Sequence, residues 1–533
     1  MARNRIIYAS QSVWCNGEVL YRVQSLGSTT TFTSEDIFEL GHLDIVDVVD
    51  DVPAVAVTLN TNDFGDVRTL AILAQVASAK RSMNATATNS NANLVAVSGT
   101  AQAEGTYYHG VGLPDFAVTC GNLTGVSLWA PVQDECSLGT LADNIDQSMW
   151  MDEVYINSLE FSYTTGANAT ENYGAETDQK MWLLNDGKFV NFEYLDVAAE
   201  TQMILDSGVT IATLSDGDLA FLRKSPGGKP AATIFDNTNN VATNVAIETG
   251  VVAATDTFVY NSGTDVLFFP TGALAPVSGD RVEVVYAGDA YASAMGNKYF
   301  DILGEADTDR PNSVGALRQG QVEVYIIDPD DSALVEWADA IAWRLTSATI
   351  TSDLTREPLA ELGHLGPYDR PLTLPIPITV TLDTTAGDLE HWARFAGKLY
   401  EFENDPNFSE IDLADLFGNE NMILVVKVYA QTDEEAGGVG ADRKVLGADN
   451  DLIGQNYWNG GTMGTYVENG TEYPLKTIIV EHLKITDEAY TLDVGANATQ
   501  TFGFRSTNDL YAVKGEVAFG DITGDFKIRR NAD

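Results

Sequence analysis

The pattern of apolar and polar positions along the chain predicts a protein built mainly from β-strands. Four segments rich in β-branched and aromatic residues have strand length and lie near turn-forming residues: 124–132, 155–165, 422–432 and 477–486. Two further strands end in the tripeptide Val-Thr-Leu, at residues 57–59 and 380–382. We therefore expect a mainly β fold.

A different spacing follows Gly65 and Gly387, where apolar residues recur every three or four positions. Such spacing places them on one face of a helix, and Asp66 or Asp388 can cap its first turn. We expect one short helix after each glycine. The apolar residues are Leu70, Leu73, Ala74 and Ala77 in the first case and Leu389, Trp392, Phe395 and Ala396 in the second.

Internal repetition is the strongest organising feature of the sequence. Residues 21–43 align without gaps on residues 343–365, and ten of the 23 aligned positions are identical. Both segments end in the pentapeptide ELGHL. The tripeptide at 57–59 then matches the one at 380–382, and Gly65-Asp66 matches Gly387-Asp388. This agreement predicts a duplicated domain.

Two weaker matches extend the repeat in each copy. The segment that begins at Leu113 aligns on the segment that begins at Leu413, and Leu159-Glu160-Phe161 aligns on Leu483-Lys484-Ile485. The pentapeptide GANAT follows in both copies, beginning at Gly166 and at Gly495. The four blocks keep their order at separations of 322, 322, 300 and 329 residues. Loops have therefore changed length while the structural elements persisted.

The repeat divides the chain into three expected domains. Residues 1–195 form the first copy and residues 319–533 the second, and each is expected to be a β-sandwich or barrel with one short helix. Their opening strands are expected at Arg5–Tyr8 and Val322–Ile327. Residues 196–318 have no counterpart and contain apolar stretches between turn signals. We expect an inserted all-β domain there, an immunoglobulin-like sandwich.

The net charge of the chain limits the classes of function that the protein can have. The 533 residues include 77 Asp and Glu against 30 Lys and Arg, for a formal net charge of −47. A protein that wraps nucleic acid needs a surplus of cations, so this class is excluded. An excess of carboxylates with few lysines is typical of proteins that work in molar salt, where repulsion is screened over about 3 Å. The alternative is an acidic protein whose single-sign field serves its function.

No catalytic, cofactor-binding or metal site is expected, and we do not expect an enzyme. The five histidines accompany no hydrolase, zinc-protease or phosphate-binding motif. His42 and His364 occupy the same place in ELGHL and are interpreted as turn residues. An acidic stretch imitates a calcium loop, but Glu410 stands where the sixth-position glycine is needed. The other three histidines are His109, His391 and His482. The calcium-like stretch contains Asp405, Asn407, Ser409 and Asp412.

Cysteines and acidic runs receive structural interpretations. Cys15, Cys120 and Cys136 are odd in number and lack C-x-x-C spacing, so we expect small buried side chains and neither disulfides nor zinc. The acidic runs 47–51, 328–331 and 433–435 are interpreted as solvated loops. No apolar run has the length of a signal peptide or a membrane span. We therefore expect folding in a cytoplasm, without membrane contact.

The order of strand, strand, long loop, strand, short helix and closing strands, present twice around ELGHL and GANAT, resembles the tail tube (major tail) proteins of tailed viruses. The resemblance covers both copies and leaves the insert aside. Some members of that family are duplicated and form trimeric, pseudo-hexameric rings that stack into a tube. It implies a homotrimer located in the virion tail and assembled in the host cytoplasm.

The resemblance also implies partners. Rings would contact one another and other tail proteins at the tube ends, and viral DNA would pass through the channel without specific binding. No residue-level site is carried over. With the salt-adapted composition, the resemblance implies a virus of a halophilic archaeon. The long loops 44–53 and 366–377 are expected to make the contacts between rings, since loops of that length are usually functional.

Three alternatives stay open at this point. Another virion component, such as a capsid, baseplate or decoration protein, also uses duplicated β-domains. A surface-layer or adhesion protein fits the acidity and the sandwiches. An enzyme acting on polysaccharide fits least, because it requires paired carboxylates that the sequence does not mark.

Overall fold

The chain is described by a computed structural model. The expected opening strand Arg5–Tyr8 and the expected helix after Gly387 lie outside the residues that it describes. The described residues are 11–20, 22–40, 43–62, 68–74, 108–116, 125–133, 145–184, 189–205, 219–236, 241–288, 322–329, 345–360, 362, 367, 370–385, 405, 422–428, 476–491, 498–514, 517, 522 and 528–529.

The fold is mainly β, as expected, with a nearly closed, barrel-like sheet. The described strands form one 17-stranded sheet, one 8-stranded sheet and a separate two-stranded hairpin. The 17-stranded sheet contains a continuous antiparallel row, here called the central sheet, with the order β3-β6-β10-β9-β21-β22-β25-β24. Its strands are β3 (Val23–Thr31), β6 (Ala54–Asn62), β10 (Thr170–Thr177), β9 (Ile145–Thr164), β21 (Leu345–Asp353), β22 (Pro377–Thr385), β25 (Thr499–Thr507) and β24 (Lys476–Thr491).

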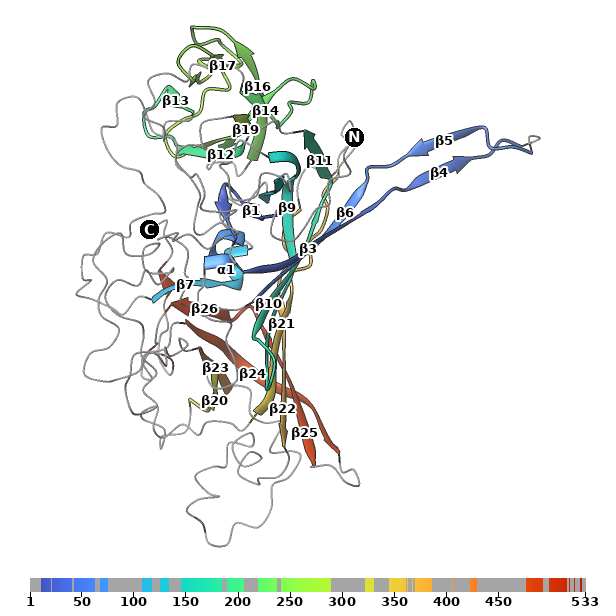
Figure 1. The fold of residues 1–533 in the computed structure, drawn as a ribbon, viewed down its shortest axis with the longest axis vertical. Helices are drawn as coiled ribbons and strands as arrows, with labels where there is room; N and C mark the ends of the chain where they lie inside the picture. The colour runs from blue at the N-terminus through green and yellow to red at the C-terminus, as the bar shows by residue number, and fades with distance from the viewer. Residues whose placement is uncertain are drawn as a thin grey trace.

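The central sheet repeats one pairing order twice. We call β1 to β11 the N-terminal set and β20 to β27 the C-terminal set. The order β3-β6-β10-β9 in the first corresponds to β21-β22-β25-β24 in the second, and β9 and β21 join the two sets by seven paired residues. In Figure 1, β9, β10, β21, β22, β25 and β24 run down the molecule, while β3 and β6 lead obliquely toward the upper right.

Irregularities recur at matching places in the two sets. The pairing of β3 with β6 shifts between Val23 and Ser25, and that of β21 with β22 shifts between Leu345 and Ser347. Gly174 faces Ser158 and Gly503 faces Asp487, each beside a bulge. A Cβ on either glycine would collide with the side chain opposite. Glycine is thus required at both bulges by close approach.

A second layer of strands packs on one face of the central sheet. In the N-terminal set, β8 and β11 pair with the first half of β9, and β1 pairs with β8 and with β2. In the C-terminal set, β23 and β26 pair with the first half of β24, and β20 pairs with β23. The bounds are β1 (Trp14–Cys15), β2 (Glu18–Val19), β8 (Val126–Gln133), β11 (Gln179–Leu184), β20 (Val322–Ile327), β23 (Met422–Val428) and β26 (Leu510–Lys514).

The long strands β9 and β24 each serve both layers. Each turns from the second layer to the central sheet at a residue with positive φ, which is Glu153 at 49° in β9 and His482 at 54° in β24. One apolar core, which includes Phe161, Leu382 and Phe504, lies between the layers and spans both sets. The two sets therefore share a single core.

The observed registers correct two of the sequence alignments. Val154 in β9 and Leu483 in β24 hold the same place after the positive-φ residue, so Leu483 does not correspond to Leu159. Val126 pairs with Val154 and Met422 pairs with Leu483. The alignment of the Leu113 segment on the Leu413 segment found the corresponding strands but placed them four residues out of register.

Elements of the N-terminal set also reach the C-terminal set. Strand β7 (Tyr108–Gly112) pairs with β26 and with β27 (Ile528–Arg529). A 3₁₀ helix, η2 (Leu113–Phe116), follows β7, and a short helix, α1 (Arg68–Leu73), follows Gly65. Leu70 and Leu73 in α1 are buried in the common core.

The segment expected as an insert has its own sheet and its own core. Its core includes Met203, Phe258 and Tyr286. Strand β12 pairs along its whole length with β19, so pairing assigns residues 189–195 to this sheet, ahead of the expected boundary at 196. The strands are β12 (Phe189–Asp196), β13 (Gln202–Ile204), β14 (Ala220–Phe221), β15 (Ala231–Asp236), β16 (Val241–Thr249), β17 (Phe258–Asn261), β18 (Val266–Phe268) and β19 (Arg281–Gly288).

A two-stranded hairpin projects from the body between β3 and β6. It consists of β4 (Ser34–Ile37) and β5 (Asp47–Asp50), and Figure 1 shows it extending away from the rest of the molecule. The acidic run at 47–51 is therefore largely a strand and not a loop. Strand pairing is favoured here by Val48 and Val49, whose β-branched side chains suit extended backbone.

Candidate assembly surfaces and the polar face of the central sheet

The central sheet has one buried face and one polar face. Strand β6 shows the alternation clearly, with Val55, Val57 and Leu59 buried and Thr58 and Asn60 exposed. The same alternation in the neighbouring strands aligns hydroxyl, amide and charged side chains on the second face. The strand pairing assigns seven charged residues of the described strands to this polar face. Five are carboxylates, Glu160, Glu176, Asp353, Asp383 and Asp487, and two are cations, Lys484 and Arg505.

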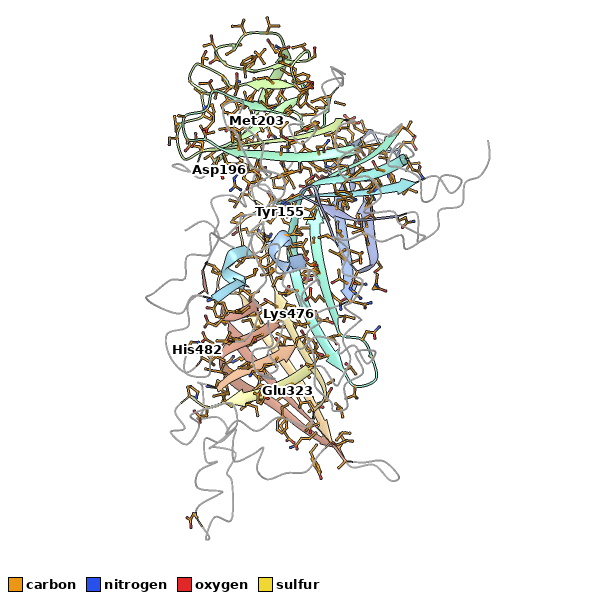
Figure 2. All side chains as sticks on the ribbon, turned by 60° about the vertical axis from the view of Figure 1, so that its left-hand side comes forward. Tyr155, Asp196, Met203, Glu323, Lys476 and His482 are labelled. Carbon is orange, nitrogen blue, oxygen red and sulfur yellow. The ribbon has the colours of Figure 1, made fainter. Side chains whose placement is uncertain are left out.

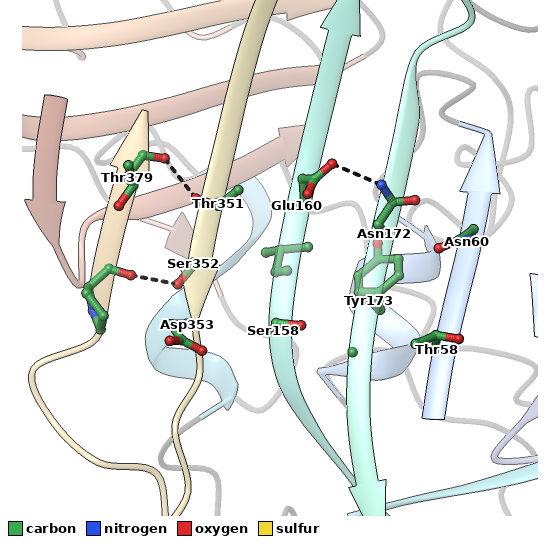
Figure 3. A pocket seen from close by; sticks show the side chains of 13 residues that line it. Thr58, Asn60, Ser158, Glu160, Asn172, Tyr173, Thr351, Ser352, Asp353 and Thr379 are labelled. Atoms are coloured by element: carbon green, nitrogen blue, oxygen red, sulfur yellow. Dashed lines mark hydrogen bonds between the residues drawn. The ribbon is translucent and has the colours of Figure 1, made fainter. Parts of the chain in front are cut away.

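This polar face is hollowed where the two sets meet. The hollow has a volume of about 620 Å³ and is lined by residues of β6, β10, β9, β21 and β22. Figure 3 shows Glu160 and Asn172 on adjacent strands, where the Asn172 amide donates a hydrogen bond of 3.0 Å to the Glu160 carboxylate. Its other polar side chains, such as Thr58 and Thr351, come from separate strands. The hollow is a feature of the sheet face.

A buried ion pair links the two sets on the opposite face. Lys476 at the start of β24 places its Nζ 2.6 Å from Oε1 of Glu171 in β10. Both side chains are almost completely buried, and the Tyr173 hydroxyl donates to the other Glu171 oxygen at 2.8 Å. Lys476 Nζ also lies 5.4 Å from the centre of the Phe161 ring. Figure 2 shows Lys476 inside the body of the molecule.

Two arginines from the segment between β21 and β22 strengthen the same junction. Arg356 donates to the main-chain oxygens of Ile156 and Phe116 at 3.0 and 3.2 Å. Arg370 donates to the carboxylates of Glu176 at 2.6 Å and Asp178 at 2.6 Å. The C-terminal set therefore supplies cations, and the N-terminal set supplies carboxylates and carbonyls.

The insert is attached through a buried arginine. Arg223 lies between β14 and β15, and its Nε is 2.7 Å from Asp152 in β9. Its Nη1 also binds Glu283 of the insert at 3.0 Å. Beside this contact, burial, followed by repulsion from Asp152, raises the pKa of Glu153 to about 7. The Gln179 amide donates to Glu153 at 2.9 Å.

The corresponding place in the C-terminal set holds Glu481, His482 and Asp509. Their ligand atoms lie within 4.8 Å of one another, a spacing that suits a cation. His482 Nδ1 is 2.9 Å from Asp509, and the His482 side chain is 63% exposed. Burial and repulsion from Asp509 raise the pKa of Glu481. Because nothing but the cluster itself points to an ion, we assign no metal site.

Few of the chemical candidates from the sequence fall within the described residues. Cys15 is buried, as expected for a small apolar side chain. Asp405 is exposed, whereas the other three residues of the calcium-like stretch are outside the described part, as are Cys120 and Cys136. His42, His364 and His391 also fall outside it. The Lys476–Glu171 pair was missed because Lys and Glu 305 residues apart give no sequence signal.

Among the described residues, no helix is long and apolar enough to span a membrane. Neither the protein-family models nor the curated proteins compared with this chain match it.

Proposed function

We propose that this protein is the tail tube (major tail) protein of a tailed virus, which forms trimeric, pseudo-hexameric rings that stack into a conduit for DNA. The supporting observation is the β9–β21 pairing, which joins two four-stranded rows of the same order into one sheet. That join leaves β3 at one end of the row and β24 at the other. These two strands are the counterparts of β21 and β9, the strands already joined.

An interface that works once within the chain can work again between chains. Pairing of β24 with β3 of the next chain continues the sheet in the same direction, and this head-to-tail contact closes into a ring when the rotation allows it. Transferring the β9–β21 register places Tyr490 opposite Ser28 of the next chain, as Phe161 lies opposite Ile350. Tyr490 is 53% exposed in the single chain, whereas Phe161 is fully buried. An aromatic side chain that is exposed where its counterpart is buried supports the presence of a neighbouring chain at this edge in the assembly.

The polar face of the sheet suits a channel wall. The opposite face is covered by the second layer, so a closed ring would turn the polar face inward. The described strands place five carboxylates and two cations on this face, and Arg370 pairs with one of the carboxylates, Glu176. The balance is still negative, and like charge keeps DNA from adhering. Side chains such as Thr58 and Thr351 add uncharged hydroxyls to this face. The face therefore suits passage and not binding.

The insert fits the outside of such a ring. It has a separate core and joins the body beside the second layer through Arg223, away from the polar face. Figure 1 shows it at the end of the molecule that is distant from β22 and β25. A domain of this size within the channel would block it.

Electron microscopy of the purified full-length chain tests the proposal. We expect rings with threefold symmetry, each showing six similar lobes, and tubes built from stacked rings in high salt. Closed shells or planar lattices would favour a capsid or surface-layer role. Dispersed monomers at every salt and protein concentration would contradict assembly altogether.

A further inference from the structure

The internal junction of the chain serves as a template for its contacts with a neighbouring chain. This inference rests on the proposed ring and specifies side chains that the ring alone does not. In the internal junction the C-terminal set receives two elements of the N-terminal set, the β9 edge and strand β7. In the ring, the N-terminal set of the next chain would receive the C-terminal set in the same way.

Strand β11 holds the place in the N-terminal set that β26 holds in the C-terminal set. Trp182 pairs with Met149, and its counterpart Ala512 pairs with Ile478. Strand β7 covers β26, where Ala512 and Val513 are 1% and 0% exposed. Within the described part of the chain, β11 pairs only with β9. Three of its apolar side chains are exposed: Met181, Trp182 and Leu184, at 36%, 68% and 92%.

Charge identifies what covers this edge. Lys180 lies next to Met181 on β11, and its Nζ donates hydrogen bonds to Ser28 Oγ at 2.9 Å and to Thr30 Oγ1 at 3.4 Å. These two hydroxyls stand on β3, the strand expected to pair with β24 of the neighbour. The β9–β21 register places Leu159 opposite Ser352, so its transfer places Glu488 of the neighbour opposite Thr30. A carboxylate would thus arrive beside the Lys180 ammonium.

A hydrogen bond within its own chain orients the Glu488 side chain. Its Oε1 accepts a hydrogen bond of 3.0 Å from the Gln500 amide, and Gln500 is 1% exposed. Gln500 holds the place of Glu171, while Gln147 holds that of Lys476. Transfer of the buried Lys476–Glu171 pair therefore gives two uncharged amides between chains. The cation and the carboxylate of that junction occupy other positions.

We propose that Lys180 of one chain and Glu488 of the next form an ion pair in the ring, beside the apolar edge of β11. The occupant of this edge is thus a second copy of the same chain, and specifically its C-terminal set. The junction within the chain and the proposed junction between chains carry different polar pairs. Two N-terminal sets placed side by side would therefore lack a partner carboxylate for Lys180. This difference favours strict alternation of the two sets around the ring.

Charge reversal in the full-length chain tests the pair. Lys180→Glu and Glu488→Lys should each lower the ring-forming fraction, measured by sedimentation velocity and electron microscopy, by at least about tenfold through like-charge contact. The double variant should restore assembly, which a merely misfolded single variant could not achieve. Lys229→Glu is the matched control, because its exposed partner Glu248 lies in the insert, and it should assemble as the wild type does.

The outcomes separate this proposal from the ring itself. A wild-type chain that never assembles overturns both. A wild-type chain that forms rings, with single variants equally competent or a double variant no better than the singles, overturns the ion pair and leaves the ring standing. Hydrogen exchange adds an independent readout, because amides of β11 should exchange more slowly in assembled rings than in single chains.

Discussion

Lys476 Nζ lies 2.6 Å from Glu171 Oε1, so a lysine of the C-terminal set neutralises a carboxylate of the N-terminal set within their common core. Neither side chain reaches solvent to any significant extent. A buried charge is tolerated only when it is paired and hydrogen-bonded. The two sets therefore depend on each other for charge neutrality as well as for apolar burial.

Removal of one member of this pair should be costly. Lys476→Met leaves the Glu171 carboxylate buried without its cation, and we expect a loss of about 3–5 kcal/mol in the free energy of unfolding, measured with urea. Lys229→Met removes an exposed lysine whose partner Glu248 is also exposed, and it should change stability by less than about 0.5 kcal/mol. Equal losses in the two variants would contradict the role of the buried pair.

Stability should depend on pH through Glu153. Its pKa is raised to about 7 by burial and then by Asp152. The folded chain thus holds a proton that the unfolded chain releases near pH 4.5. This contribution is complete below about pH 4.5 and is lost as the pH rises through about 7.

Glu153→Gln should flatten that dependence and should be more stable than the wild type above pH 7, by up to about 3 kcal/mol. Denaturant unfolding across pH 4.5 to 8 provides the measurement. Glu248→Gln, at an exposed position in the insert, serves as the control. A wild-type slope retained in Glu153→Gln would assign the pH dependence to another group.

Gly125 should not tolerate a side chain. It has a φ of 67°, and a Cβ there would lie 2.8 Å from the Val154 carbonyl oxygen and 2.9 Å from the Glu153 carbonyl carbon. Gly166 has a φ of 81° with no atom within 4 Å of the same Cβ position, so it isolates the effect of φ. We expect Gly166→Ala to cost about 1 kcal/mol and Gly125→Ala about 3 kcal/mol in thermal or urea unfolding. Similar losses would show that the backbone at Val154 gives way.

The β4–β5 hairpin should connect one ring to the next. Its tip carries Leu40 and Leu43, which are 105% and 98% exposed, and β4 and β5 add exposed apolar residues. Leu40→Asp should leave single rings intact and shorten or abolish tubes, as seen by electron microscopy. Leu362→Asp compares the same place in the C-terminal copy of ELGHL, which is equally exposed. If the Leu40→Asp variant forms normal tubes, the β4–β5 hairpin does not make the contact between stacked rings.

The charge of the polar face should govern DNA passage. Replacement of Glu160, Asp353 and Asp383 by Lys places cations where phosphates would pass, and each contact adds salt-dependent affinity. We expect slower DNA release from particles whose tubes still form, with the difference shrinking as salt rises. The same number of Lys substitutions on the outer surface of the insert provides the control. Unchanged release would contradict the role of the acidic lining while leaving the tube proposal in place.

Sequence comparison within the chain located most elements but misaligned some of them. The alignment of residues 21–43 on 343–365 agrees with the observed bulges in β3 and β21. The match of Leu159 with Leu483 is wrong, because Leu159 follows the bulge in β9 whereas Leu483 precedes the bulge in β24. The extra residue of a bulge shifts the apolar alternation by one position, so two segments that are misaligned by an odd number of residues still show the same alternation. Alternation with a period of two does not by itself fix a register.

The sequence by itself determined the strand-rich composition, the repeated order of elements and the presence of an unrepeated segment, because these depend on local alternation and turn residues. Only the tertiary structure decided which strands meet at β9 and β21, which edges lie at the ends of the sheet, and that Lys476 reaches Glu171. Such contacts join residues hundreds of positions apart, and their energy comes from burial and charge pairing that exist only once the two sets share one core.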